Sequence, residues 1–161
     1  ILSSDSFMVS MWIYPTEEHS WRCALYVKYE TGFFGMIPIA WEGHSSFRIR
    51  DSKEVDGWYD ISGCKLQVNE WSHYVVSYNA KTETAYAYIN GQLVGSMKNV
   101  PGNRYAKRIV LGGDVFQPSF IGKICEVTFY NEIRDHDFVS ELHQSYVTRD
   151  DFIGFEIGID K

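Results

Sequence analysis

The sequence predicts an all-β fold, a two-sheet antiparallel β-sandwich (jelly roll) with one short helix near the C-terminus. Short apolar runs rich in β-branched and aromatic residues recur along the chain, with turn residues roughly every eight to twelve positions. A single Asn-Gly pair marks a tight hairpin. Only one segment shows the spacing of an amphipathic helix. At 161 residues, the chain is predicted to form one domain over residues 1–161.

The predicted strands follow from alternation and from the turn residues that bound them. Their ranges are 7–15, 22–30, 32–42, 45–52, 71–79, 107–114 and 120–131, together with the hairpin at 85–96. Residues 53–63 are rich in turn residues and are predicted to be mainly loop. Residues 152–160 alternate apolar and polar side chains, which predicts a terminal strand.

Asn90-Gly91 is expected to turn the hairpin, because both residues tolerate the positive φ angles of a primed turn. In the strand before it, Tyr86 and Tyr88 should face the opposite side from Ala87. The turn is therefore predicted to set the register of one sheet.

The predicted helix begins near Asp135 or Asp137, either of which is a suitable N-cap. Phe138, Leu142 and Tyr146 follow at intervals of four and form an apolar stripe. We expect this helix to pack as a lid on the edge of the sandwich.

Composition restricts the partners. The net charge of -6 and the pI of about 5.3 argue against a nucleic-acid or anionic-membrane partner, for which a basic patch is expected. There is no apolar span of about 18 residues, no Asn-x-Ser/Thr sequon and no leader before Ile1. The chain is therefore expected to be a soluble piece of a longer protein.

Three cysteines, Cys23, Cys64 and Cys125, lie far apart and form no CxxC pair. This spacing argues against a zinc site and against a dense disulfide framework. We expect small buried residues, with one disulfide and one remaining thiol as the open alternative.

Four motifs occur in a characteristic order. They are Trp71 with His73, Tyr88 with Asn90 and Gly91, the Leu-Gly-Gly run at 111–113, and a strand whose motif positions are Phe120, Gly122, Ile124, Val127, Tyr130 and Asn131. This order resembles the laminin-G-like, concanavalin A-like lectin and glucanase superfamily over roughly residues 7–147. The resemblance implies a jelly roll.

The family usually has an additional strand before the one that corresponds to residues 7–15. Almost nothing precedes that strand in this sequence. We expect residues 152–160 to fill the corresponding place beside the first strand and to cover its edge.

The sequence does not support an enzyme. Laminarinase-like members of the superfamily carry Glu-x-Asp-x-x-Glu on one strand, and retaining hydrolysis needs two carboxyl groups about 5 Å apart. The nearest segment here runs from Glu126 to Glu132 and has no Asp between its ends. His73 is interpreted as a hydrogen-bonded structural residue. No cofactor is required, although the family resemblance leaves a structural Ca²⁺ near Asp114 as an option.

A binding site is predicted where the strand pattern breaks, between Trp41 and Tyr59. Phe47 and Ile49 should face the core, which turns Arg48 and Arg50 outward. Aromatic rings stack on sugar rings, and Arg and carboxylate groups suit vicinal hydroxyls. The predicted carbohydrate-binding residues are Trp41, Glu42, Arg48, Arg50, Asp51, Trp58, Tyr59, Arg104 and Tyr105, with Phe116 as a further wall. The alternative is a solvated face on which these arginines pair with acids and Trp58 packs under a loop.

The leading interpretation is a non-catalytic carbohydrate-binding module similar to those appended to secreted glycoside hydrolases. Its expected partners are an oligo- or polysaccharide and the covalently linked domains of a larger parent chain, in an extracellular or cell-surface location. The alternative is a protein-interaction or adhesion module of the laminin G or neurotoxin lectin-like type. A concave pocket with two rings and converging polar groups would favour sugar, whereas a flat apolar surface would favour protein.

Overall fold

The computed structural model describes residues 6–51, 57–101 and 105–149. Sheet A contains β1 (Phe7–Pro15), β6 (Ser72–Asn79), β7 (Thr84–Ile89), β8 (Gln92–Met97) and β10 (Gly122–Tyr130). Sheet B contains β2 (Leu25–Lys28), β3 (Gly32–Ile37), β4 (His44–Asp51), β5 (Trp58–Lys65) and β9 (Arg108–Leu111). A 3₁₀ turn, η1 (Trp41–Gly43), precedes β4, and the helix α1 (His136–Val147) follows β10.

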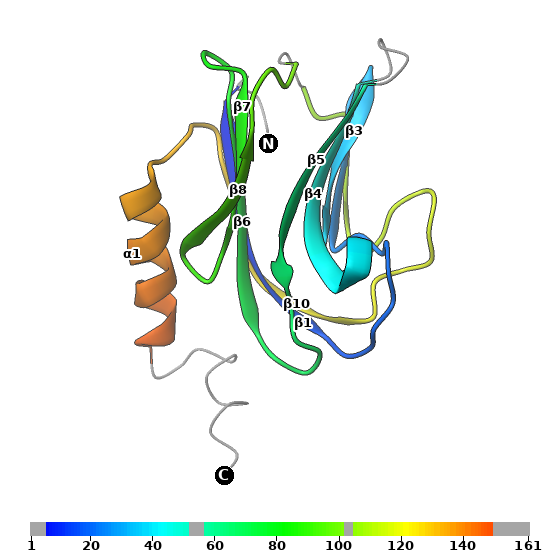
Figure 1. Cartoon of the computed structure of the whole chain (residues 1–161), viewed down its shortest axis with the longest axis vertical. Helices are drawn as coiled ribbons and strands as arrows, with labels where there is room; N and C mark the ends of the chain where they lie inside the picture. Colours follow the sequence, from blue (N-terminus) through cyan, green and yellow to red (C-terminus); the bar gives the residue numbers. More distant parts are fainter. Residues whose placement is uncertain (1–5, 52–56, 102–104, 150–161) are drawn as a thin grey trace.

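The two sheets are antiparallel and pack face to face (Figure 1). The strand order is β10-β1-β6-β7-β8 in sheet A and β5-β4-β3-β2-β9 in sheet B. The predicted two-sheet sandwich with one C-terminal helix is confirmed.

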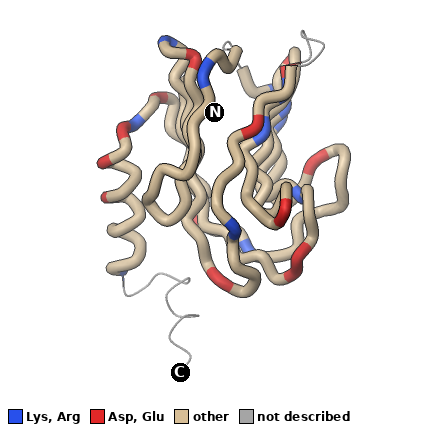
Figure 2. The backbone as a smooth tube through the Cα atoms, viewed as in Figure 1, with Lys and Arg blue, Asp and Glu red and all other residues tan. Residues whose placement is uncertain are grey.

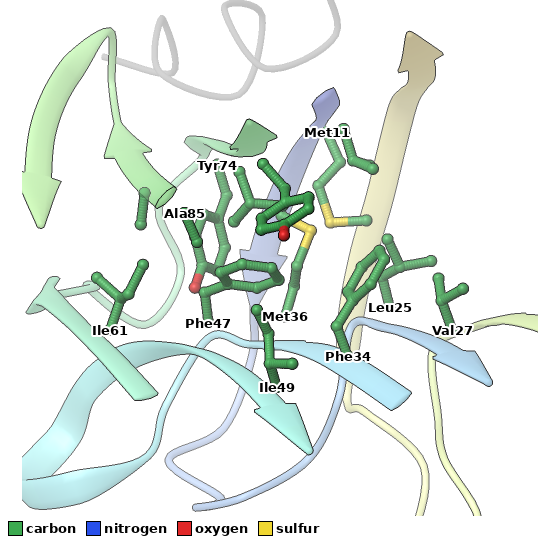
Figure 3. Packing of buried hydrophobic residues seen from close by; sticks show 14 of the residues in the cluster. Met11, Leu25, Val27, Phe34, Met36, Phe47, Ile49, Ile61, Tyr74 and Ala85 are labelled. Atoms are coloured by element: carbon green, nitrogen blue, oxygen red, sulfur yellow. The ribbon is translucent and has the colours of Figure 1, made fainter. Parts of the chain in front are cut away.

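The core lies between the sheets and is built by alternation along each strand. Sheet A contributes residues such as Met11, Tyr74 and Ala85, and sheet B contributes residues such as Phe34 and Phe47 (Figure 3). All five are at most 1% exposed. Because the inward positions of both sheets are filled with apolar side chains, the alternate positions are left to form the two outer faces.

The hairpin prediction is confirmed. Asn90 and Gly91 have φ angles of 51° and 78°, as a primed turn requires. The side-chain oxygen Oδ1 of Asn90 also accepts a hydrogen bond from the backbone N–H of His73, at 2.9 Å. The turn therefore joins β7 to β8 and is tied to β6 as well.

The strand bounds differ most from prediction at the edge strand β5 of sheet B. Residues 53–63 were predicted to be mainly loop, yet Trp58–Lys65 form β5, which pairs with β4. The turn residues Asp56, Gly57 and Asp60 led to the loop prediction. Backbone pairing to β4 accommodates Asp60 because its side chain finds a partner across the strands.

The predicted vacancy beside the first strand is wrong. β1 pairs with β6 on one side and with β10 on the other, so both of its edges are occupied. Residues 152–160, which were expected to fill that place, lie outside the described residues.

The helix forms where the sequence predicts it, but the prediction that it packs on the edge of the sandwich is wrong. Asp135 is the N-cap, and its Oδ1 accepts a hydrogen bond from the N–H of Phe138 at 2.9 Å. The helix covers the outer face of sheet A and does not close its edge (Figure 1). The apolar stripe meets an outward row that includes Met8 and Trp12, so the face offers more apolar area than the edge.

The cysteines are only partly as predicted. All three are free, so the alternative of one disulfide is excluded in this structure. Cys23 is buried, Cys125 is half-buried, and Cys64 is exposed on β5. Burial raises the pKa of Cys125 to about 11, with a further contribution from the charge of Glu126.

Charged positions of both signs are interspersed over the described part of the chain (Figure 2). Among the same residues, no helix is both long enough and apolar enough to cross a membrane.

Candidate functional site

The outer face of sheet B carries a cleft with a volume of about 180 Å³. Half of its lining residues are aromatic, and a few polar side chains join them. The lining residues are Trp21, Cys23, Tyr26, Phe33, Ile37, Arg48, Trp58, Asp114, Phe116 and Gln117.

The floor of the cleft follows from strand alternation. Leu25 and Phe34 point into the core, so Tyr26 on β2 and Phe33 on β3 face outward. The two rings are in contact, with centroids 5.2 Å apart. Gly35 lies in the same outward row, and a Cβ there would come within 3.0 Å of the Cys23 sulfur. The absent side chain at Gly35 therefore leaves room for the Cys23 thiol beneath the cleft.

Arg48 is the best-fixed polar group of the cleft. It lies directly opposite Asp60 in the β4–β5 register, and its Nε and Nη2 donate to the two carboxylate oxygens at 2.6 and 2.9 Å. Its guanidinium carbon also lies 4.6 Å from the Trp21 ring centroid and 4.9 Å from that of Trp58. Two rings and a bidentate ion pair thus hold one guanidinium in place.

Arg50 supports the same wall from the next outward position of β4. Its guanidinium carbon lies 4.9 Å from the Trp58 ring centroid, and its Nη1 donates to the carbonyl oxygen of Asp51 at 2.7 Å. Trp58 is 49% exposed and touches the edge of Phe33. One side of Trp58 is therefore supported by protein while much of the ring remains accessible.

The opposite wall is the loop 112–121, which lies against the outer side of sheet B (Figure 1). Asp114 Oδ1 accepts hydrogen bonds from the N–H groups of Phe116 and Gln117 at 2.6 and 2.7 Å. The loop is anchored at its ends by the bond from Phe120 N–H to the Gly112 carbonyl and by Arg22, which donates to Ser119. The wall is therefore pre-formed.

Phe116 extends from this loop over the aromatic floor. Its ring lies 5.4 Å from Phe33 and 6.2 Å from Tyr26, and the residue is still 63% exposed. Beneath the loop, burial raises the pKa of the Cys23 thiol, and a hydrogen bond to Asp114 and that residue's charge raise it further. Cys23 is thus a neutral, unreactive part of the floor.

The structure brings together only some of the predicted site residues. Arg48 and Trp58 line the cleft, and Arg50 packs on Trp58. Trp41 does not line the cleft, but its ring meets the edge of Trp21 at 4.6 Å and is 55% exposed.

The other predicted residues lie elsewhere. Asp51 is 6% exposed and has the inward parity of Ile49, and Tyr59 packs against the core. Glu42 borders a different cleft. Tyr105 is exposed and lines neither cleft, and Arg104 lies outside the described residues. The pairing of Trp58 with Tyr59 as one ligand surface is thus not present, because neighbours on a strand point to opposite faces.

Sequence reasoning missed several cleft residues. Tyr26 and Phe33 were detectable, because the alternation rule that placed Arg48 outward also applies to β2 and β3. Trp21 and Gln117 were not among the predicted site residues. Both approach the cleft through loops, where alternation gives no information.

Among the described residues, Glu126 and Glu132, the ends of the segment nearest to the hydrolytic motif, have other surroundings. Glu126 lies on β10 with a φ of 51°, where two residues oppose one at an irregularity in the β1–β10 register. Glu132 is paired with Arg134 at 2.5 Å. His73 is fully buried, and its Nε2 is hydrogen-bonded to Ser10 Oγ at 2.7 Å, as expected for a structural histidine.

The residues around Asp114 do not fit a calcium site. One oxygen of its carboxylate already accepts two backbone hydrogen bonds, whereas calcium requires six to eight oxygen ligands. Within the described residues, no group of three or more His, Cys, Asp or Glu side chains could hold a metal ion. The possibility of a structural Ca²⁺ therefore stays a prediction without support from this carboxylate.

Several solved structures share the fold. The chain superposes on domain 4 of AbnA, a GH43 extracellular arabinanase from Geobacillus stearothermophilus in complex with arabinotriose, with a TM-score of 0.76 and 24% identity. That match covers 89% of this chain and 69% of the other. The Ruminococcus gnavus IT-sialidase CBM40 bound to α2,3-sialyllactose gives a TM-score of 0.70 at 14% identity, with 86% and 82% of the two chains covered.

The binding domain of botulinum neurotoxin serotype D also matches, with a TM-score of 0.73 and 15% identity. Here the match covers 89% of this chain but only 37% of the neurotoxin domain. At these identities the likeness concerns the fold alone.

The sequence comparisons agree with the fold. A search of curated proteins gave no significant match. A sequence profile of a family described as the Concanavalin A-like lectin/glucanases superfamily matches residues 1–140. That match covers most of the chain, in keeping with the four motifs and the two-sheet architecture. The chain therefore belongs to the concanavalin A-like lectin/glucanase superfamily.

Proposed function

We propose that this chain is a non-catalytic carbohydrate-binding module and that the cleft over sheet B holds a neutral sugar. The observation that carries the proposal is Arg48, which is fixed between Trp21 and Trp58 in an aromatic cleft. A pyranose or furanose ring has an apolar face that stacks on such rings and hydroxyl groups that need fixed polar partners.

The hydrogen-bonding capacity of the cleft suits hydroxyl groups. Arg48 uses Nε and Nη2 for Asp60, which leaves Nη1 to donate to a ligand. Gln117 offers both a donor and an acceptor. The Asp114 carboxylate accepts hydrogen bonds from the loop backbone and from the Cys23 thiol, and its remaining acceptor capacity can serve a hydroxyl group.

Charge favours a neutral sugar over an acidic one. The positive charge of Arg48 is already neutralised by Asp60, and Asp114 adds a further carboxylate to the cleft. The whole chain carries a net charge of -6. The charges of Arg48 and Arg50 are offset by those of Asp60 and Asp114, so an anionic sugar would find no net positive charge at this site, and the negative charge of the whole chain would oppose its approach.

A tethering role is supported by the same features. The cleft lacks a carboxyl pair arranged for acid–base chemistry, since Asp60 is held by Arg48 and Asp114 caps its own loop. The arabinanase domain of the same fold is part of an extracellular enzyme. We infer that this chain acts in an extracellular or cell-surface protein and holds linked domains, such as a glycoside hydrolase, near their glycan.

The test is glycan-array screening followed by isothermal titration calorimetry, with arabinotriose and α2,3-sialyllactose as the first probes. We expect binding to a neutral oligosaccharide and little or none to sialyllactose. Trp58→Ala and Phe116→Ala should each weaken binding by at least about tenfold, since each removes a stacking ring.

Tyr105→Ala is the matched control, because Tyr105 is equally exposed but lines neither cleft. Failure of the wild-type protein to bind any glycan would overturn the proposal. Normal binding by both cleft variants would show that sugar binds elsewhere.

A protein-interaction module is the second candidate, and one observation favours it. Leu111, Val115 and Phe116 are between 52% and 63% exposed and lie on the strand and loop beside the cleft. Such a rim would also suit an apolar protein surface. Under that alternative the array would be blank, and replacement of Val115, outside the cleft, would weaken partner binding as strongly as replacement of Trp58.

A further inference from the structure

A second cleft lies beside the first and is polar where the first is aromatic. Its volume is about 290 Å³. Five of its eight lining residues have polar side chains, and all five are exposed: Glu18, Ser20, Glu42, Lys65 and Gln67. This set offers both hydrogen-bond donors and acceptors, which suits a ligand with many hydroxyl groups.

Two chain segments connect the clefts. In the segment before β2, Ser20 lines the second cleft and the next residue, Trp21, lines the first. In the segment after β3, Ile37 lines the first cleft, and Ile39 lines the second. The clefts are therefore neighbours, and the segments 20–21 and 37–39 form the boundary between them, here called the shared wall.

Trp41 stands at this shared wall. Its ring meets Trp21 nearly perpendicularly, at 87° with centroids 4.6 Å apart, and Glu42 directly after it lines the second cleft. At 55% exposed, it is a large apolar ring on the surface, although the chain has core positions for other Trp residues such as Trp12.

The backbone conformation after Trp41 holds its ring at the surface. Glu42 adopts a left-handed conformation with φ of 50°, which is unfavourable for a residue with a side chain. The turn is secured by hydrogen bonds from Ala40 N–H to the His44 carbonyl at 2.7 Å and between His44 Nδ1 and the Trp41 carbonyl at 3.3 Å. The ring is thus presented by a fixed turn.

We propose that the two clefts and Trp41 form one continuous binding track, in which a sugar in the first cleft is followed by units that stack on Trp41 and enter the second cleft. The ligand class is a neutral oligosaccharide of at least two units. Acidic side chains outnumber basic ones in the second cleft, where Glu18 and Glu42 accompany Lys65, so the charge preference of the first cleft continues along the track. This inference rests on the proposed sugar-binding function and deepens it.

The experiment measures affinity as a function of chain length. Arabino-, xylo-, cello- and fructo-oligosaccharides of one to four units are titrated by calorimetry into the wild-type protein, Trp41→Ala and Lys65→Met. Tyr105→Ala and Lys98→Met are matched controls, since both residues are exposed and line neither cleft. Thermal unfolding followed by circular dichroism verifies that each variant is folded.

For the series that binds best, we expect affinity to rise by at least about tenfold from one unit to three. Trp41→Ala should reduce the gain in affinity from one unit to three by about fivefold or more, since one aromatic contact contributes about that much. Lys65→Met should act in the same direction, and both controls should behave as the wild type.

Two results would overturn the track. One is binding that is equally tight for one and three units. The other is a Trp41→Ala variant that retains the full gain with length. Either result would leave single-sugar binding in the first cleft intact, whereas absence of any binding by the wild type would overturn the proposed function along with the track.

Discussion

Arg48 combines a structural contact with the donor role that we propose for it in sugar binding. Its pairing with Asp60 is set by strand register, and its position between Trp21 and Trp58 requires a planar cation. Both partners of the ion pair are less than one-quarter exposed, so the pair is shielded from solvent more than a surface pair is. The guanidinium is therefore a structural part of the cleft wall as well as a hydrogen-bond donor.

Arg48→Lys should weaken sugar binding by at least about tenfold and reduce the free energy of unfolding by about 1 kcal/mol. A lysine ammonium cannot bond both carboxylate oxygens in the same fork or stack flat between two rings. Calorimetry with the best array ligand and urea unfolding provide the two measurements. Arg108→Lys is the control, because it makes the same type of change at an exposed residue of β9. A variant with unchanged affinity would mean that the charge alone matters and the planar fork does not.

At this scale, alternation in the predicted strand 45–52 was sufficient to turn Arg48 and Arg50 outward, because a period of two determines the face. Trp58 was selected as an aromatic residue in a predicted loop, and its outward position on β5 was not predicted. Phe116 was identified only as a further wall, and Trp21 was not predicted as a site residue. Their places depend on loops that come from distant parts of the chain, and no local pattern encodes that proximity.

A cluster of aromatic and histidine rings lies between the helix α1 and the outer face of sheet A. His143 stacks on Trp12 at 5.5 Å and on His73 at 5.5 Å, and Tyr146 meets both Trp12 and His73 edge-on. Burial lowers the pKa of His73 to about 3, with a contribution from His143, and burial also lowers the pKa of His143. Both imidazoles are consequently neutral where the helix docks.

Stability should therefore fall as the medium becomes acidic. Because both folded-state pKa values lie below the unfolded value of 6.5, the unfolded chain binds more protons, and the neutral pair contributes its full stability only above about pH 6.5. The loss begins as the pH drops below 6.5 and continues for His73 down to about pH 3. One such group costs up to about 1.4 kcal/mol per pH unit within this window.

Urea unfolding at pH 7, 6 and 5 measures this dependence. His143→Leu should reduce the slope between pH 7 and pH 5, because one of the two imidazoles whose pKa is lowered on folding is removed. The control His19→Leu replaces a histidine whose side chain is 43% exposed and is paired with Glu17. An identical slope in the wild type and in His143→Leu would contradict the assignment of the acid sensitivity to this stack.

The elements themselves were predicted unevenly. The β7–β8 hairpin and α1 were found from local signals, namely an Asn-Gly turn, a capping Asp and a regular apolar stripe. β5 was missed because its strand character comes from pairing: Asp60 is a poor strand former that becomes acceptable opposite Arg48. The position of α1 was missed for a related reason, since a stripe identifies the face that is buried but not the surface that buries it.

At the level of the whole molecule, the two outer faces of the sandwich are covered by different elements. The outward row of sheet A is covered by α1 (Figure 1). The outward residues Tyr26 and Phe33 of sheet B are also buried, but only under the exposed rings of Phe116 and Trp58, which leave the aromatic cleft at the surface. The two sheets pack roughly 10 Å apart around the core. Both sheets and this core therefore lie between the two outer faces. The family resemblance indicated this architecture, but it does not indicate which face a given member uses.

This separation predicts that stability and binding can be changed independently. Leu142→Ala under α1 should reduce the free energy of unfolding by about 2 kcal/mol, because it opens space beside Trp12 and Tyr146, and should leave affinity unchanged. Trp58→Ala should weaken binding by at least about tenfold, yet change stability by less than about 1 kcal/mol, since the ring is half exposed.

In the Leu142→Ala/Trp58→Ala double variant, the changes in the free energy of unfolding should equal the sum of the two single changes to within about 0.5 kcal/mol, and so should the changes in the free energy of binding. This is expected for sites that share no contacts. Urea unfolding and calorimetry on the wild type, both single variants and the double variant complete the cycle. A coupling free energy above about 1 kcal/mol would show that the helix face and the cleft communicate through the core. The cleft would then be a property of the whole sandwich, whereas additivity would make it a local property of sheet B and the loop 112–121.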